Sequence, residues 1–263
     1  MIHTKDLGFV VVHIPHSSFY IPEEYKKDFL ITEDLLQKEL AQMTDSYCDE
    51  LYDAPEIKNK IIAPVSRLIC DMERFRDDKH ESNSKRGHGL MYTKTSTGKR
   101  LRENDQNLRN RILDEFYDPH HRCFEKAVEN ALKKYNKCLI IDAHSFNSKK
   151  IVKIGNLFGL PDFDIGTDKF HTPDILSYTL FNKIKELGYR PCINSPSSGA
   201  ITPMKFYRKD RRVLSIMIET NRKLYMDEST LQRSSHFEKI SCICRSLMLH
   251  AAHSANDYFN NNH

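Results

Sequence analysis

The nine residues from Cys138 to Phe146 constrain the fold more strongly than any other part of the chain. They begin as a continuous apolar run with β-branched residues, a pattern typical of a strand buried on both faces of a parallel sheet. Polar side chains then appear at Asp142, His144 and Ser145, where such a strand would end. Because open α/β sheets bind ligands at the carboxyl ends of their strands, this stretch predicts an α/β fold and the position of a candidate site.

Asp142 and His144 are two residues apart, so in a strand their side chains point to the same face. A carboxylate beside an imidazole orients a metal-bound or a catalytic histidine. The same pair also occurs as a structural pair that hydrogen-bonds a loop. The residues of this stretch alone leave both interpretations open.

A second strand that ends in histidine is predicted from Gly8 to Ile14. Pro15 ends its ladder because proline has no N–H to donate. His16 lies beyond the strand and is a better metal-ligand candidate than His13, which lies inside it. Two strands whose ends carry imidazoles predict a zinc site at the edge of the sheet.

Asp45 is one candidate for the carboxylate ligand of that zinc. Apolar residues at helical spacing predict a helix that begins near Thr32, and a second helical stretch runs from Met43 through Leu51. Asp45 lies near the start of this second stretch, where an N-cap is the simpler interpretation. The alternative is that Asp45 completes a site with two histidines.

Asp71 is the rival carboxylate. The residues from Lys60 to Asp71 predict two short strands interrupted at Pro64, with Asp71 at the end of the second. Arg67 and Arg74 bracket this aspartate, and arginine forks bind carboxylates in bidentate fashion. This segment is therefore the predicted place for the acidic end of a substrate, the alternative being a surface ion-pair cluster of little energetic value.

The rest of the chain predicts mostly helices and loops around a further strand. That strand, from Leu214, ends at Glu219, and His121 lies in the first turn after Pro119. Helices are predicted for residues 101–135, with a break near Pro119, for residues 174–187, where Gly188 ends the helix, and for residues 231–258. Loops are predicted for residues 77–99 and 194–200, and a strand followed by a loop for residues 155–166.

Composition excludes several classes of protein. The 263 residues are 39% hydrophobic and 29% charged, as in an ordinary globular protein, and the length suits one large α/β domain or two small ones. Seven cysteines without a CxxC pair or a secretory signal fit reduced thiols, so we expect a cytoplasmic protein. The charges are interspersed and no apolar run approaches the length of a membrane span, so we expect neither a nucleic-acid nor a membrane partner.

Several motifs, taken in order, make the chain resemble the N-formylglutamate amidohydrolase family from about His13 to Asp227. They are His13-Ile-Pro-His16-Ser-Ser, Met43-Thr-Asp45, Ser66-Arg67 with Asp71 and Arg74-Phe75, Tyr117-Asp-Pro119-His-His121, Asp142-Ala-His144-Ser, Asp164 through Pro173, and Ile218-Glu219 through Met226.

The resemblance implies one domain over residues 1–263 with a three-layer α/β/α fold. Its sheet would be mixed and mostly parallel, as in the zinc carboxypeptidases, phosphorylase/hydrolase-like proteins and the zinc-dependent muramoyl amidases. Zn²⁺ would be held by His16, His144 and Asp45, with Asp71 as the rival ligand, and Glu219 would be the general base. The remaining implied site residues are His121 as a second catalytic residue and Arg67, Asp71, Arg74, Ser145 and Arg222 as substrate-binding residues.

The function implied by the resemblance is hydrolysis of the amide bond of an N-acyl amino acid that carries carboxylates. N-formyl-L-glutamate is the first choice, with formate and glutamate as products. One alternative is a zinc amidase or peptidase of the same fold with another acylated or peptide substrate. A more distant alternative is a binding protein that has lost the metal.

Overall fold

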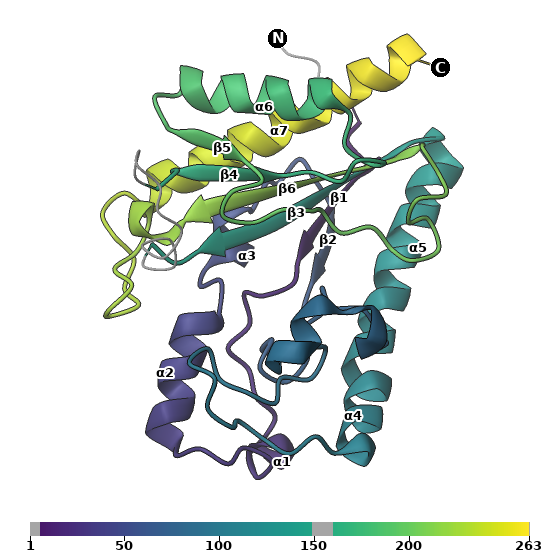
Figure 1. Cartoon of the computed structure of the whole chain (residues 1–263). Helices are drawn as coiled ribbons and strands as arrows, with labels where there is room; N and C mark the ends of the chain where they lie inside the picture. Colours follow the sequence, from purple (N-terminus) through teal and green to yellow (C-terminus); the bar gives the residue numbers. More distant parts are fainter. Residues whose placement is uncertain (1–5, 149–159, 263) are drawn as a thin grey trace. The chain divides into compact units, whose positions relative to one another are not determined.

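Strands β1, β3 and β6 form the parallel centre of the sheet around which the chain folds (Figure 1). The computed structural model describes residues 6–148 and 160–262. Within these residues six strands join in the order β2-β1-β3-β6-β4-β5, with β4 antiparallel to β6 and β5 parallel to β4. The strands are β1 Val10–Ile14, β2 Asn59–Ile62, β3 Cys138–Phe146, β4 Phe163–Gly166, β5 Pro191–Ile193 and β6 Val213–Asn221.

The contacts divide the chain into two compact units. Unit 1 comprises Met1–Ile14, Tyr47–Ile61 and Phe124–His263, and unit 2 comprises Pro15–Ser46 and Ile62–Cys123. The sheet belongs to unit 1, apart from the last residue of β2. The assignment of residues 1–263 to one domain stays a prediction.

The register of the sheet separates polar from apolar side chains. On one face of the sheet the residues that pair across neighbouring strands are apolar: Val12 pairs with Ile141, and Ile141 with Ile216. On the other face the paired residues become polar toward the carboxyl ends of the strands. The first polar pair is His13–Asp142 and the next is His144–Glu219. Because side chains alternate along a strand, this register delivers the titratable groups to one face and one end of the sheet.

Helices α3, α6 and α7 cover the apolar face, and Figure 1 shows α6 and α7 lying along it. The buried residues of α7 recur at three- and four-residue spacing from Ile240 to Phe259, which places one stripe of the helix against the sheet. The bounds are α3 Cys48–Leu51, α6 Asp174–Glu186, η5 Arg222–Leu224 and α7 Phe237–Asn262.

Helix α5, Asp118–Tyr135, covers the amino-terminal part of the polar face and belongs to unit 1 from Phe124 onward. Phe124 and Val128 pack against apolar residues of β1, β3 and β6, and the Phe124 ring stacks on His13 at 4.6 Å between centroids. Unit 1 therefore has three layers, and the predicted α/β class with a mixed, mostly parallel sheet is confirmed.

Unit 2 is built mainly from short helices around its own apolar core. Leu36 and Leu40 bury one face of α2 in that core, together with Leu68 and Ile69 from an irregular segment. The elements are α1 Glu23–Lys26, α2 Glu33–Met43, η1 Asp78–His80, η2 Ser82–Arg86, α4 Gln106–Ile112 and the π-turn η3 Leu113–Tyr117.

Two predicted elements differ from the structure. The segment before Asp71 is a turn and not a second strand, because the Ser66 carbonyl accepts hydrogen bonds from the N–H groups of Ile69 and Cys70. The helical region is not broken at Pro119: η3 leads directly into α5, and Pro119 lies in the first turn of α5. Proline is tolerated in a first turn, where an N–H has no intrahelical acceptor.

Within residues 6–148 and 160–262, no helix combines the length and the apolar character that a membrane span requires. Part of the strand and loop predicted for residues 155–166 lies outside the described residues, and β4 accounts for its end.

Candidate functional site

In unit 2, His16 is buried and its two ring nitrogens face different carboxylates. Nε2 donates a hydrogen bond to Asp71 Oδ1 at 2.8 Å, while Nδ1 lies 3.7 Å from Asp45 Oδ2. The Asp45 N–H also donates to the His16 carbonyl at 2.9 Å, which ties the two segments together. His16 and Asp45 are each about 2% exposed.

Asp45 is not a helix cap. The N-cap of α3 is Tyr47, in a left-handed conformation with φ 65°, and no side chain caps this helix. The N-cap interpretation of Asp45 is therefore wrong, and the Asp45 carboxylate lies instead beside His16.

Asp71 is the charged centre of unit 2. Besides His16, it accepts hydrogen bonds from Arg67 Nη2 at 2.8 Å and from the Tyr92 hydroxyl at 2.6 Å, and Arg74 Nη2 lies 3.5 Å from Oδ2. The Glu73 N–H donates to Oδ1 at 3.1 Å. Burial opposes ionisation of this carboxyl, but the two arginines outweigh it and hold the pKa of Asp71 well below its usual range.

In unit 1, Asp142 has for His144 the role that Asp71 has for His16. The His144 Nε2 lies 3.2 Å from Asp142 Oδ1, and His13 Nδ1 donates to the same oxygen at 2.9 Å. The N–H of Ile201 approaches the other carboxylate oxygen at 3.3 Å. Both histidines predicted as metal ligands are thus held through Nε2 by a buried aspartate, an arrangement that orients metal-binding imidazoles in proteins.

Glu219 is beside His144 on β6 and directly opposite Asp164 on β4. Its side chain is 7% exposed, whereas Asp164 is fully buried. Asp164 accepts hydrogen bonds from the N–H groups of Ser195 and Ser197 at 3.0 and 2.9 Å. Burial raises the pKa of Asp164, although these N–H groups act against the shift.

At the carboxyl ends of the central strands, Arg222 Nε donates to Ser145 Oγ at 3.1 Å, and both residues are buried. The residues predicted for the site come from both units. Unit 1 holds His144, Ser145, Glu219 and Arg222, and unit 2 holds His16, Asp45, Arg67, Asp71 and Arg74.

His121, the second predicted catalytic residue, belongs to unit 2 and is bonded to the main chain. Its Nε2 donates to the Met72 carbonyl at 3.0 Å, and its ring lies 4.1 Å from that of Tyr117. Burial lowers the pKa of His121 to about 4, so the ring is neutral at pH 7.

The sequence did not reveal Tyr92 or Asp164 as members of these groups. Tyr92 lies in a long loop whose path no periodic pattern predicts, and it reaches Asp71 only because the loop folds back. Asp164 could have been found from β4, since the alternation of a strand that pairs with β6 places it opposite Glu219.

Several of these side chains could hold a metal ion. Within unit 2, the ligand atoms of His16, Asp71 and Glu73 lie within 4.8 Å of one another. Imidazole nitrogens and carboxylate oxygens are the donor set that zinc takes in catalytic sites. The predicted ligands His16, Asp45 and His144 offer the same types of donor, and these types fit zinc.

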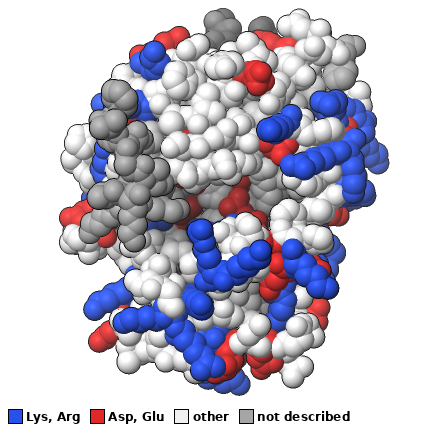
Figure 2. All heavy atoms as spheres, in the orientation of Figure 1, with Lys and Arg blue, Asp and Glu red and all other residues white. Residues whose placement is uncertain are grey.

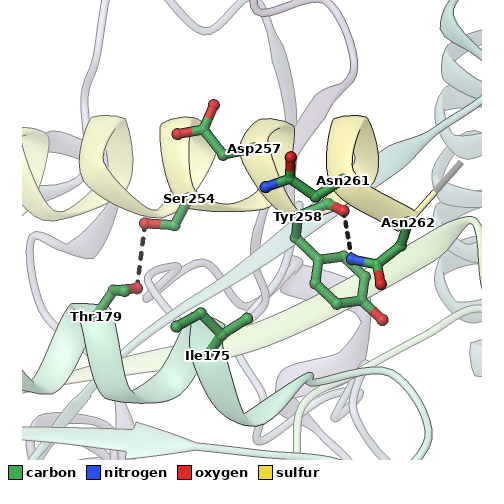
Figure 3. Close-up of a pocket in the computed structure, with 7 residues that line it drawn as sticks. All are labelled: Ile175, Thr179, Ser254, Asp257, Tyr258, Asn261 and Asn262. Carbon is green, nitrogen blue, oxygen red and sulfur yellow. Dashed lines mark hydrogen bonds between the residues drawn. The ribbon is translucent and has the colours of Figure 1, made fainter.

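A surface pocket of about 250 Å³ lies elsewhere, against α6 and α7 (Figure 3). Two of its polar groups are already paired: Thr179 with Ser254 at 3.1 Å, and the Asn262 amide with the Tyr258 carbonyl at 2.7 Å. Its lining does not include the strand-end residues of unit 1 described above.

The face of the molecule in Figure 2 shows basic and acidic side chains interspersed, without one continuous basic surface.

The sequence matches the family model of N-formylglutamate amidohydrolase over residues 9–226. Among solved structures, the chain is similar to an N-formylglutamate amidohydrolase from Ralstonia eutropha JMP134, with 20% identity and a TM-score of 0.79 over 95% of this chain and 94% of that one. It is also similar to a gene product of Agrobacterium tumefaciens, with 17% identity and a TM-score of 0.67 over 96% and 94% of the two chains. No curated protein matches the sequence.

Proposed function

Because the chain belongs to the N-formylglutamate amidohydrolase family, we propose that it hydrolyses the amide bond of N-formyl-L-glutamate to formate and L-glutamate. The family supports amide hydrolysis, and the substrate and the metal are our proposal. The observation that carries it is that His16 and His144 are both held through Nε2 by buried aspartates, as metal-binding histidines are.

We assign the metal ligands to His16, Asp45 and His144. When Nε2 carries the proton that is donated to the aspartate, Nδ1 carries the lone pair that binds a metal. The distance of 3.7 Å from His16 Nδ1 to Asp45 Oδ2 suits two ligands that each lie about 2 Å from one zinc ion. Asp71 is the poorer ligand because both of its oxygens already accept hydrogen bonds.

A zinc ion bound there would polarise the scissile carbonyl and lower the pKa of water toward 7. Glu219 would take a proton from the attacking water on its carboxylate and pass it to the leaving amide nitrogen. Its position at the end of β6, beside His144 on β3, supports this role.

The substrate carboxylates require fixed positive charge. The guanidinium groups of Arg67 and Arg74 both face one oxygen of Asp71, Oδ2. Arg74 lies further from that oxygen, at 3.5 Å against 2.8 Å, and is therefore the arginine of the pair with more capacity for a substrate carboxylate. Arg222, oriented by Ser145, is the corresponding candidate in unit 1.

We propose a positioning role for His121. Its bond to the Met72 carbonyl fixes the main chain between Asp71 and Glu73. A ring that stays neutral at pH 7 does not serve as a cationic acid at that pH.

The test is formate release from N-formyl-L-glutamate by the wild type and by Glu219→Gln. Loss of a general base lowers kcat about 10²–10⁴-fold, and we expect a loss in this range while the zinc content stays unchanged. Glu238→Gln is the matched control, since Glu238 is an exposed glutamate on α7, and it should retain full activity.

If the wild type hydrolyses other N-acyl amino acids but not N-formyl-L-glutamate, the proposed amide hydrolysis stands and the proposed substrate is wrong. An equally active Glu219→Gln variant would remove Glu219 from the mechanism. A wild type that hydrolyses none of these amides would contradict the proposal as a whole.

A further inference from the structure

The loop from Asn194 to Ile201 runs beside Glu219. Both carboxylate oxygens of Asp164 accept hydrogen bonds from this loop, from the N–H groups of Ser195 and Ser197. Asp164 and Glu219 are directly opposite each other on the antiparallel strands β4 and β6, so their side chains share a face. The start of the loop is therefore fixed next to the proposed general base.

The end of the loop is fixed to the same face of the sheet. The Ile201 N–H approaches Asp142 at 3.3 Å, and the Ser215 hydroxyl donates to the Ile201 carbonyl at 2.6 Å. In between, the loop passes so close to β4 that a Cβ on Gly166 would lie 2.3 Å from the Gly199 carbonyl oxygen. The position of the loop is thus set by three strands.

Between these anchors the loop presents three successive N–H groups, those of Ser198, Gly199 and Ala200. None of them donates to an acceptor in the described part of the chain. Gly199 has φ +97°, and successive N–H groups around a residue in a left-handed conformation form concavities that bind anions. Ser198 is exposed and the other two residues are half-buried, so a ligand can reach them.

Resting on the proposed function, we infer that this loop binds the α-carboxylate of the N-acyl amino acid through the N–H groups of Ser198, Gly199 and Ala200. The covalent structure of the substrate selects this carboxylate. Its Cα, which bears the α-carboxylate, is bonded directly to the nitrogen that receives the proton from Glu219. The side-chain carboxylate lies further along the substrate, and we assign its binding to the arginines proposed above.

The test compares Gly199→Ala with Gly188→Ala. Both glycines have a positive φ, +97° and +83°, and a Cβ on either would meet no atom within 4 Å. Both substitutions therefore impose backbone strain without a clash, but Gly188 follows α6 and lies outside the loop. The two variants should lose similar amounts of stability, so any difference in kinetics reports on the loop.

Three substrates identify the carboxylate: N-formyl-L-glutamate, its α-amide and its side-chain amide, N-formyl-L-glutamine. Charge-assisted hydrogen bonds favour a carboxylate over an amide. In Gly199→Ala, the preference in kcat/KM for N-formyl-L-glutamate over the α-amide should fall about tenfold, as expected for the loss of one hydrogen bond to a charged group. The preference over N-formyl-L-glutamine should stay as in the wild type, and Gly188→Ala should change neither.

A Gly199→Ala variant that loses activity equally on all three substrates would show that the loop is only structural, and would overturn the inference. A collapse of the preference over N-formyl-L-glutamine would also overturn it, because the loop would then bind the side chain. In both cases the proposed function stands. If the wild type hydrolyses none of the three substrates, the proposed function itself is contradicted.

Discussion

At the scale of single residues, Asp71 shows how far the sequence could predict the site. Arg67 and Arg74 bracket it in the sequence, and the structure brings both arginines to its carboxylate. The contacts to His16 and Tyr92 join segments 55 and 21 residues away, and no local pattern encodes them. The types of residue in the candidate site were therefore readable, but their partners depended on the folded loops.

Asp71→Asn should destabilise the protein strongly. The substitution keeps the volume but removes the charge that balances Arg67 and Arg74 in a fully buried position. Breaking a buried ion pair by removing one partner costs about 3–5 kcal/mol, and we expect a loss in this range in urea unfolding. In the control Asp53→Asn, which affects an exposed ion pair with Lys60, the loss should stay below about 1 kcal/mol. Similar losses in the two variants would refute the central role of Asp71.

His121 should make the folded protein sensitive to acid. Its pKa is about 4 when folded, below the ordinary value of 6.5, so the unfolded chain binds a proton first as the pH falls. The contribution to stability is complete above pH 6.5 and is lost as the pH falls toward 4. Because the ring is partly exposed, we expect this loss to be about 2 kcal/mol.

The measurement is the free energy of unfolding between pH 7 and pH 4 for the wild type and His121→Gln. The glutamine does not titrate, so the variant should lose less stability over this range. The exposed His80 provides the control His80→Gln, which should follow the wild type. Parallel curves for His121→Gln and the wild type would contradict the burial argument.

Among the helices and strands, the sequence predicted those features that neighbouring residues determine, such as where a helix begins or ends. Thr32 accepts a hydrogen bond from Leu35 N–H at the start of α2, and α6 ends just before Gly188, which has φ +83°. The predicted strand through Asp142 and His144 is present and runs from Cys138 to Phe146. The turn before Asp71 was not predicted, because its apolar residues enter the core of unit 2 without the regular pattern of a strand.

Tyr52 connects the ends of the two strands that carry the unit 1 residues. Its hydroxyl lies 2.9 Å from the Ile218 carbonyl, 3.2 Å from the His144 carbonyl and 2.7 Å from Thr220 Oγ1. Tyr52→Phe should cost about 1–2 kcal/mol in urea unfolding, because buried polar groups lose a partner. It should also lower kcat, since the strand ends that position His144 and Glu219 are loosened.

The control is Tyr178→Phe on α6, where the tyrosine is 58% exposed. This variant should match the wild type in stability and in kcat. A Tyr52→Phe enzyme with unchanged kcat would show that the hydroxyl supports the fold alone.

At the scale of the whole molecule, the order of motifs along the chain was more informative than any single motif. The family match over residues 9–226 confirms the resemblance, and the sheet confirms the fold class. The division into two units was not predicted, because each unit is assembled from segments that are separate in the sequence. Contacts between distant segments are set by packing, which sequence patterns do not record.

We propose zinc-dependent hydrolysis of N-formyl-L-glutamate as the activity of this protein. The most direct measurement is formate release by one preparation as isolated, after removal of metal with a chelator, and after return of zinc, with the metal content determined at each step. We expect about one zinc per chain, loss of formate release when the zinc is removed, and recovery when zinc is returned. Formate release at the full rate by protein shown to be free of metal would contradict it.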